Sequence, residues 1–294
     1  MIPFAGNSNF ANEIRNIIKV VSNNNASILL RGERGTGKRL FAQCVHYEKS
    51  KTLNGFFEVN CKSLNLNESI AVLENFIRDK SVAVKTIYIN FIEKTDIEFQ
   101  KFLLSSIKEV KEKGMNIRFI CSTEINIEEN LTNGLFLSDL FYQINNVVLN
   151  FLPLRQREQD IIPICEYYFN KFKSNTGIKF EKISDSAVDL LKKYYWKGNV
   201  DELINSIQRA FIVGELPQIK VSDLGINFND ITLDYSGLTS IENVPLKDAI
   251  NSFKRYYVTK VLSENNWNQT KTARILGIQR TYVIKLINEL QIRK

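Results

Sequence analysis

The sequence has little of what metal centres and disulfide frameworks are made from. It contains one histidine and four cysteines among 294 residues, and the cysteines stand far apart in the chain. No zinc-ligand spacing and no disulfide framework can be built from this set, which fits a reducing compartment such as the cytoplasm. We therefore expect four small core residues: Cys44, Cys61, Cys121 and Cys165.

Long hydrophobic runs are absent as well. No apolar stretch approaches the roughly 18 residues that cross a bilayer, and the N-terminus lacks the basic start and apolar core of a secretory signal. With 44% apolar and 24% charged residues, wholesale disorder and fibrous repeats are also excluded. We expect a cytoplasmic protein of about two domains with no membrane partner.

Positive charge is concentrated in one short part of the chain. Of the net charge of +7, all falls in residues 246–294, where ten Lys or Arg face three Asp or Glu. The other residues hold twenty-nine charges of each sign. Such a concentration suggests a polyanion as partner, although a solvated basic helix face would give the same count.

The first 150 residues alternate short apolar strands with amphipathic helices, which predicts a parallel sheet with right-handed crossovers. From about Arg155 to Val221 the pattern is purely helical. Residues 225–245 have the polar, turn-rich composition of a linker. Helical periodicity returns at Leu246. The strands are expected at 26–32, 56–61, 85–91 and 117–123, and the later helices near 158–173, 184–195 and 200–213.

A glycine-rich loop follows the first predicted strand. The order strand, G-x-x-x-x-G-K and helix is the context of a P-loop, in which backbone N–H groups, Lys38 and the helix dipole attract phosphate. Arg39 replaces the Ser or Thr that usually holds Mg²⁺, and an inherited turn that no longer takes nucleotide is the alternative. The expected binding residues are Gly32, Glu33, Arg34, Gly35, Thr36, Gly37, Lys38 and Arg39.

The segment GERGTGK, with VHYEKS and FFEVNC after it, resembles the AAA+ domain of bacterial enhancer-binding transcription activators that work with sigma-54. Further similarities follow in the family's order over residues 3–213: FLSDLFYQIN, LPLRQREQDI and YYWKGNVDELINSIQRA. The C-terminal segment is similar to the Fis-type helix-turn-helix of these activators. Because the similarity begins almost at Met1, no separate N-terminal receiver or sensory domain is expected.

The resemblance implies an α/β fold: an AAA+ P-loop parallel sheet with a helical lid subdomain, followed by a small all-α Fis-type helix-turn-helix domain. We place the α/β subdomain at residues 1–154, the lid at 155–224, the linker at 225–245 and the DNA-binding domain at 246–294. The implied ligand is ATP or ADP.

Positions at which the resemblance implies acids for hydrolysis carry other side chains. At the end of the strand after the P-loop unit, Asn90 and Phe91 stand where Asp and Glu are implied, and neither can activate water. Glu93 or Asp96 is the alternative source of an acid, although both are expected to lie beyond the strand.

Three further catalytic elements differ from the implied pattern. Glu124 stands at the polar sensor position, Leu137 and Gln143 at the paired arginine fingers, and Asp201 at the second sensor arginine. From these changes we expect no catalytic residue and no ATP turnover, so that the protein is not an enzyme. ATP or ADP would bind weakly, with little contribution from Mg²⁺.

The resemblance also implies a Gly-Ala-Phe-Thr-Gly-Ala loop that grips the sigma factor. The interval between Cys61 and Thr86 contains no glycine and is shorter than in the family. We therefore expect action independent of sigma-54.

Residues 269–288 have the spacing of a helix-turn-helix. Ala273 is the small residue where the helices cross, Gly277 suits a turn with φ > 0, and apolar residues flank both. A helical hairpin with a basic face is the alternative. Arg280 and Gln279 are suited to reading guanine and adenine. The residues expected to bind DNA are Lys271, Arg274, Gln279, Arg280, Thr281, Tyr282 and Lys285, with Arg293 and Lys294 as further phosphate contacts.

The sequence thus favours a sequence-specific transcription regulator that binds double-stranded DNA as a homodimer or higher oligomer, with RNA polymerase as a further candidate partner. The amphipathic segment 246–262 resembles a dimer-forming helix, although packing within one chain would explain its apolar face. The alternatives are an active ATP-hydrolysing sigma-54-dependent activator and a replication initiator or helicase loader.

Overall fold

The computed structural model describes residues 4–62, 66–226 and 251–292, the last range without 252, 253, 256, 260, 264, 266 and 291. The chain divides into two compact units, residues 1–231 and 232–294, each with its own hydrophobic core. Most of the predicted linker, as well as Arg293 and Lys294, lies outside the described residues.

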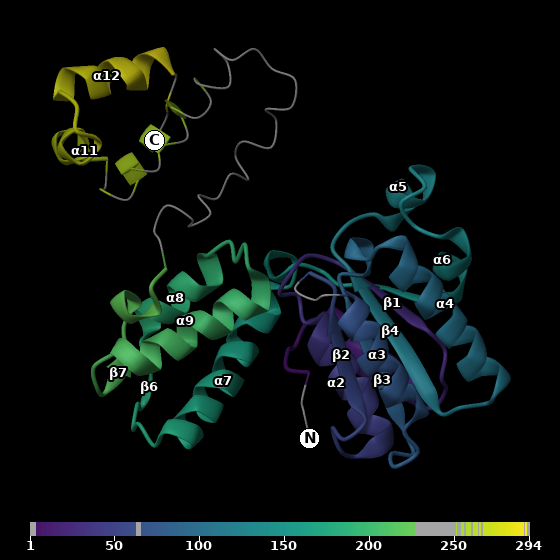
Figure 1. The fold of residues 1–294 in the computed structure, drawn as a ribbon. Helices are drawn as coiled ribbons and strands as arrows, with labels where there is room; N and C mark the ends of the chain where they lie inside the picture. The colour runs from purple at the N-terminus through teal and green to yellow at the C-terminus, as the bar shows by residue number, and fades with distance from the viewer. Residues whose placement is uncertain are drawn as a thin grey trace. The chain divides into compact units, whose positions relative to one another are not determined.

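A five-stranded parallel sheet forms the centre of the first unit (Figure 1). The four predicted strands are present. A fifth, β5, was missed because, unlike the equally short β1, it has no fully buried residue. The strand order is β2-β3-β4-β1-β5. The bounds are β1 Ile28–Arg31, β2 Phe56–Asn60, β3 Lys85–Asn90, β4 Ile117–Thr123 and β5 Val147–Asn150.

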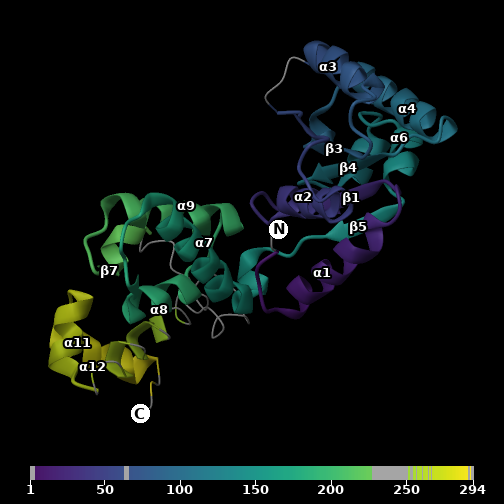
Figure 2. The same cartoon turned by 90° about the horizontal axis from the view of Figure 1, so that it is seen from below.

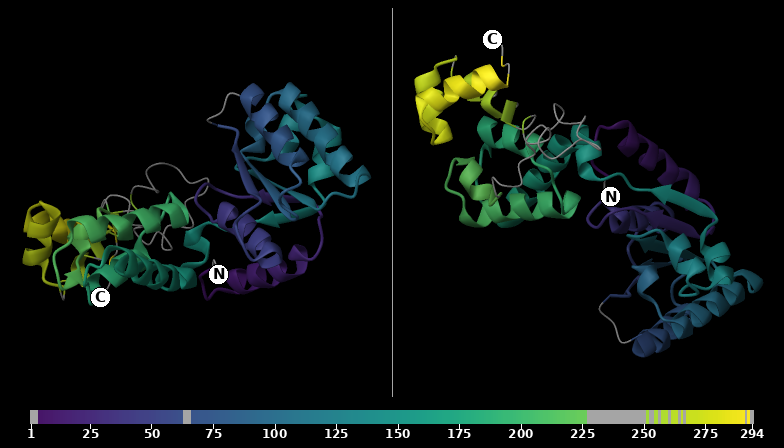
Figure 3. Two further views of the ribbon diagram at one scale, coloured as in Figure 1. Left: turned by 60° about the horizontal axis from the view of Figure 1, so that its bottom comes forward. Right: turned by 90° about the horizontal axis from the view of Figure 1, so that it is seen from above.

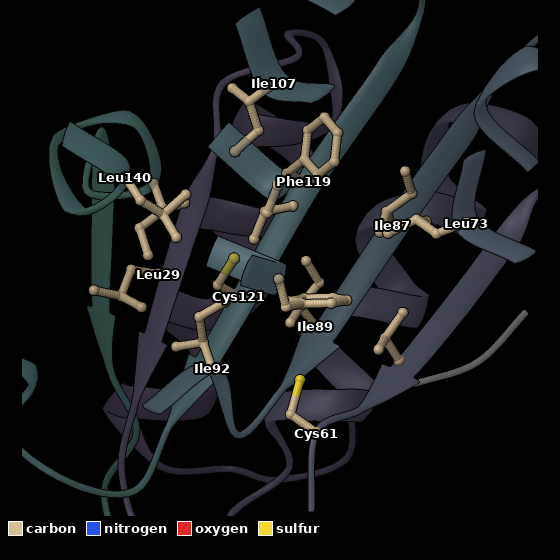
Figure 4. Packing of buried hydrophobic residues seen from close by; sticks show 14 of the residues in the cluster. Leu29, Cys61, Leu73, Ile87, Ile89, Ile92, Ile107, Phe119, Cys121 and Leu140 are labelled. Carbon is tan, nitrogen blue, oxygen red and sulfur yellow. The ribbon is translucent and has the colours of Figure 1, made fainter. Parts of the chain in front are cut away.

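Helices cover both faces of this sheet, because successive strand residues point to opposite sides. Leu29 joins a core with α3, α4 and α6, whereas Ile28 and Leu30 join a second core with α1 and α2 (Figure 2). Figure 4 shows the first core, where Ile87, Ile89, Phe119 and Cys121 of the sheet lie among helix residues. The bounds are α1 Asn9–Ser22, α2 Lys38–Ser50, α3 Leu66–Arg78, α4 Ile97–Glu112, α5 Ile127–Thr132 and α6 Ser138–Ile144.

Three longer helices form the lid that follows the sheet (Figure 3). They match the predicted segments and enclose a core around the fully buried Trp196. The prediction of a purely helical region is wrong in one respect, because the region also contains two strands of two residues each, which pair in parallel. Strands of two residues leave no detectable periodicity. The bounds are α7 Ile161–Thr176, α8 Asp185–Lys193, α9 Asn199–Val213, β6 Lys182–Ile183 and β7 Gln218–Ile219.

The second unit contains the two helices of the predicted helix-turn-helix, α11 Gln269–Leu276 and α12 Arg280–Glu289. Gly277 ends α11 with φ 65°, as expected for the turn, and a Cβ there would meet no atom within 4 Å. The positive φ alone therefore favours glycine. Ala273, Val283 and Leu286 are buried in a small core.

Parts of the predicted segment 246–262 lie outside the described residues, among them Ile250 and Phe253 of its apolar face. Of the rest of that face, Val261 is buried and Tyr257 is 39% exposed. None of the four cysteines forms a disulfide, and all four are buried, as expected for core residues.

Candidate nucleotide site and nucleic-acid interface

The glycine-rich loop joins β1 to α2 and has the backbone that its sequence predicts. Gly32, Gly35 and Gly37 all have positive φ angles, and Gly37 directly precedes α2 without a side-chain cap. The N–H groups of the first turn of α2 are therefore available to an anion.

Lys38 is the first residue of α2 and is 6% exposed. Its Nζ donates hydrogen bonds to the carbonyl oxygens of Gly32 (2.6 Å) and Glu33 (2.7 Å). Burial lowers the pKa of this ammonium to about 8, and the negative charges of Glu124, Glu93 and Asp201 oppose the shift. The loop thus holds a buried cation with three acids around it.

A cavity of about 430 Å³ opens at this loop. Of the eight residues predicted to bind nucleotide, five line it: Arg34, Gly35, Gly37, Lys38 and Arg39. The other three, Gly32, Glu33 and Thr36, shape the loop instead. Thr36 is buried, and its hydroxyl donates to the Glu33 carbonyl at 2.8 Å. Further lining residues come from the strand ends and the lid: Asn60, Tyr88, Asn90, Phe91, Glu124, Tyr168, Val200 and Asp201.

The lid holds the loop through polar contacts that sequence reasoning missed. Arg155 pairs with Glu33 (Nη1 to Oε2, 2.8 Å), and its hydrogen bond is the main cause of a lowered pKa of that carboxyl. Asn199 donates from Nδ2 to Glu33 Oε2 (3.1 Å) and to the Arg34 carbonyl (2.9 Å). Both residues lie in the blocks LPLRQREQDI and WKGNVDELINSIQRA, whose similarity to a family was the available signal.

Gly35 is where the lid approaches the loop most closely. Its φ is +77°, and a Cβ at this position would overlap the Gly198 carbonyl oxygen. The Val200 backbone N–H donates to the Gly35 carbonyl at 2.9 Å. A side chain here would therefore push the lid and the loop apart.

We expect Gly35→Ala to destabilise the first unit by about 1–3 kcal/mol more than Gly134→Ala does. Gly134 has a similar φ of +68° with no atom within 4 Å, so it isolates the cost of the backbone angle from the cost of the clash. Thermal unfolding of both variants measures the difference. Equal unfolding temperatures would show that the loop and the lid are not packed as described.

At the end of β3, Asn90 and Phe91 occupy the positions where the resemblance implied a pair of acids, and their contacts differ from those of such a pair. The Asn90 Oδ1 accepts a hydrogen bond from the Ser122 hydroxyl (2.7 Å) and another from the Tyr88 hydroxyl (3.3 Å). Phe91 has φ 61° and ψ 51°, the left-handed region that is rare for a bulky side chain. Its ring lies 3.7 Å below the Lys62 Nζ.

The residues at the usual metal-holding positions do not fit Mg²⁺. Arg39 carries a positive charge and pairs with Glu58 (Nε to Oε2, 2.6 Å), and the Asn90 oxygen already accepts two hydrogen bonds. Within the described ranges, no three His, Cys, Asp or Glu side chains are grouped so that they could hold a metal ion.

Besides Glu124, which lines the cavity, three other altered positions lie in different surroundings. Leu137 precedes α6, and Gln143 on α6 accepts a hydrogen bond from Lys111 at 2.6 Å. Asp201 lines the cavity from α9, and burial raises the pKa of its carboxyl.

In the second unit, the seven residues predicted to bind DNA are all exposed. Lys271 and Arg274 lie on α11, whereas Arg280, Thr281, Tyr282 and Lys285 lie on α12. Gln279 stands one residue before α12, as its N-terminal cap. Lys285 pairs with Glu289 at 3.5 Å. An exposed basic helix after a tight turn is the geometry of a DNA-reading module.

No helix in the parts of the chain that the structure covers is both long and apolar enough to span a membrane.

Three regions of the chain match known families. Residues 5–154 match the sigma-54 interaction domain, residues 155–235 an AAA+ ATPase lid domain, and residues 251–284 the Fis family of bacterial regulatory proteins.

Curated relatives include the Nif-specific regulatory protein of Klebsiella pneumoniae, 30% identical over 96% of this chain and 58% of its own length. The regulatory protein AtoC of Escherichia coli (strain K12) is 28% identical over 90% of this chain and 62% of its own. The chain thus spans about three fifths of the length of these relatives.

Two solved structures share the fold. NtrX from Brucella abortus in complex with ADP has a TM-score of 0.66 and 24% identity, over 99% of this chain and 69% of its own. A variant of RuvB from Thermotoga maritima has a TM-score of 0.53 and 16% identity, over 94% of this chain and 84% of its own.

A P-loop unit with an AAA+ lid, followed by a helix-turn-helix unit, defines a class of bacterial transcription regulators. The chain belongs to the sigma-54 interaction domain family within that class. The predicted fold class and the predicted resemblance are thereby confirmed.

The expectation that the protein is not an enzyme is wrong. It was based on side chains at single positions. Over its whole length, however, the lid matches the AAA+ ATPase lid domain, and the sheet-containing part matches the sigma-54 interaction domain. The physical reason is that an acid can reach the cavity from a neighbouring strand or from the lid. Glu124 and Asp201 both line it, so Asn90 and Phe91 do not leave the site without a carboxylate.

Proposed function

We propose that this chain is a transcription regulator that binds double-stranded DNA through α11 and α12 and binds and hydrolyses ATP in the cavity at Lys38. The observation that carries the proposal is the presence in one chain of a glycine-loop cavity around a buried lysine and of an exposed basic helix after a tight turn. The Brucella abortus relative, whose structures are in complex with ADP and with ATP, supports the choice of nucleotide.

Each predicted part of the chain would have its own role. Residues 1–154 and 155–224 would hold the nucleotide, with the loop residues 32–39 around its phosphates. Residues 225–245 would link this part to the DNA-binding residues 246–294. The regulator would work in the cytoplasm, where the DNA is, as a homodimer or higher oligomer with RNA polymerase as a further partner. In a dimer, two copies of α12 about 34 Å apart would read half-sites one helical turn apart.

We further propose that the protein acts independently of sigma-54, because it lacks the glycine-containing loop that the family resemblance implies. The interval after Cys61 contains no glycine, and its helix α3 packs into the core through Leu73 and Ile77. Transcription from a bound promoter, reconstituted with polymerase carrying either sigma-54 or another sigma factor, tests this. Activation that strictly requires sigma-54 would refute it.

Nucleotide binding is expected to depend little on Mg²⁺. Lys38 and the loop N–H groups remain, whereas Arg39 and Asn90 replace groups that hold a metal. Calorimetric titration of ATP with Mg²⁺ and with a chelator should therefore give affinities within about threefold, since the metal normally reaches phosphates through one or two protein ligands. A loss of binding in chelator would refute this expectation.

The affinity for ATP is expected to fall about tenfold between pH 7 and pH 9, because the pKa of Lys38 is about 8. Below that pH the ammonium is charged and attracts phosphate, and above it the lysine must take up a proton before it can do so. Lys38→Arg is the control, because a guanidinium remains charged throughout this range. An affinity of the wild type that is constant or rises over this range would contradict the assignment.

A further inference from the structure

The acid that hydrolysis requires is absent from β3, but the next strand supplies one at the same edge of the sheet. β3 and β4 are parallel neighbours in which Asn90 lies opposite Ser122. Glu124 comes two residues after Ser122, beyond the end of β4, and lines the cavity that holds Lys38. Among the acids whose negative charge opposes the lowering of the Lys38 pKa, Glu124 has the largest effect.

Glu124 has one engaged carboxylate oxygen and one without a partner. Its Oε2 pairs with the Lys62 Nζ at 2.8 Å. Its Oε1 is buried and accepts no hydrogen bond from any described residue. A buried polar atom without a partner is costly, and a bound water or ligand is a usual explanation.

Phe91 is part of this arrangement. Its left-handed backbone begins a 3₁₀ turn over Ile92–Lys94, and Ile92 joins the core beside Cys61 and Cys121 (Figure 4). The Phe91 ring lies under the same Lys62 ammonium that pairs with Glu124. The aromatic ring therefore supports the cation that holds the acid.

The other candidate acids are less suited. Asp96 caps α4 by accepting from the Phe99 N–H at 2.8 Å. Glu93 also has a buried oxygen, Oε2, without a partner among the described residues, but it does not line the cavity, and its Oε1 accepts a hydrogen bond from the Glu124 N–H at 3.5 Å. Asp201 lines the cavity from the lid, where the positive charges of Arg34, Lys38 and Arg39 act on it.

We propose that Glu124 is the carboxylate that activates the attacking water, with Lys62 and Phe91 as positioning residues. This inference rests on the proposed ATP hydrolysis. The water oxygen attacks the γ-phosphorus, and the water proton passes to Glu124. The bond from the γ-phosphorus to the bridging oxygen breaks, its electron pair stays on ADP, inorganic phosphate is released, and Glu124 returns the proton to solvent.

The test measures phosphate release and calorimetric ATP binding with the full chain. Glu124→Gln should lower kcat at least about 100-fold, as expected for loss of a general base. Its affinity for ATP should stay within about threefold of the wild type. Glu98→Gln is the matched control, because this exposed glutamate on α4 should leave both quantities unchanged. Unfolding temperatures verify that each variant is folded.

Two variants of Lys62 test its positioning role. Lys62→Met should lower kcat about tenfold while ATP binding is kept, and Lys62→Arg should restore most of the rate, because it keeps a cation beside Glu124. Equal losses in both variants would contradict this role.

Two outcomes would overturn the inference while the proposed function stands: full kcat in Glu124→Gln, or a loss of kcat confined to Glu93→Gln. A wild type that binds ATP without turning it over would refute the hydrolysis on which the inference rests. A wild type that binds no ATP would refute the nucleotide half of the proposed function altogether.

Discussion

Replacing Lys38 with methionine is expected to weaken ATP binding about 100-fold. Hydrogen bonds to charged groups contribute about 1.5–3 kcal/mol each, and the loop holds the ammonium in place through two of its own carbonyls. Methionine keeps the length of the stem and fills the buried space, so that the charge is the main loss. Calorimetric titration of ATP into both proteins at pH 7 measures the effect.

Two controls accompany this variant. Lys19→Ala removes an exposed charge from α1 and should leave affinity unchanged. The unfolding temperature of Lys38→Met should stay close to that of the wild type, because removing a buried ammonium offsets the loss of its two hydrogen bonds. Unchanged ATP affinity in a folded Lys38→Met protein would show that the loop is not the phosphate site.

Arg280→Ala is expected to cost about 1–3 kcal/mol of DNA-binding free energy and to relax the preference at one base pair. Arg280 is exposed at the start of α12, where the helix of this motif enters the major groove. A bidentate contact to guanine discriminates among bases, so the loss should be confined to the specific duplex. Gel shifts on a specific and a scrambled duplex measure it.

Lys271→Ala is the contrasting change in the same unit. Lys271 is exposed in the first turn of α11, and a phosphate contact there should weaken binding to all duplexes alike and lower the salt slope by about one. A chain that ends at residue 245 should not bind DNA, because it lacks both helices and all of the net positive charge. If Arg280→Ala weakens every duplex equally, the base-reading helix has been wrongly assigned.

Periodicity and glycine spacing were enough to predict the large elements. Four strands, the lid helices and the turn at Gly277 follow from local pattern, because each is fixed by burial or by a backbone angle that few residues adopt. β5 was missed because it is short and none of its residues is fully buried, and the pair β6–β7 was missed because strands of two residues have no readable period.

The candidate site was only partly predictable, because many of its contacts join residues that lie far apart in the sequence. The loop residues are contiguous and carry a recognisable motif, whereas Arg155 and Asn199 reach Glu33 from more than a hundred residues away. The same reason explains the wrong prediction of an inactive domain. The prediction compared single positions, Glu124 and Asp201 among them, with an implied pattern, whereas the fold brings both of these acids into one cavity.

We expect the cavity at Lys38 to belong to a working ATPase within a DNA-binding regulator. Phosphate release from ATP by the full chain, measured beside Lys38→Met with and without duplex DNA, tests this expectation. Turnover should be above background in the wild type and indistinguishable from background in Lys38→Met. Phosphate release that is the same in both proteins, with DNA or without it, would show that the cavity at Lys38 does not hydrolyse ATP.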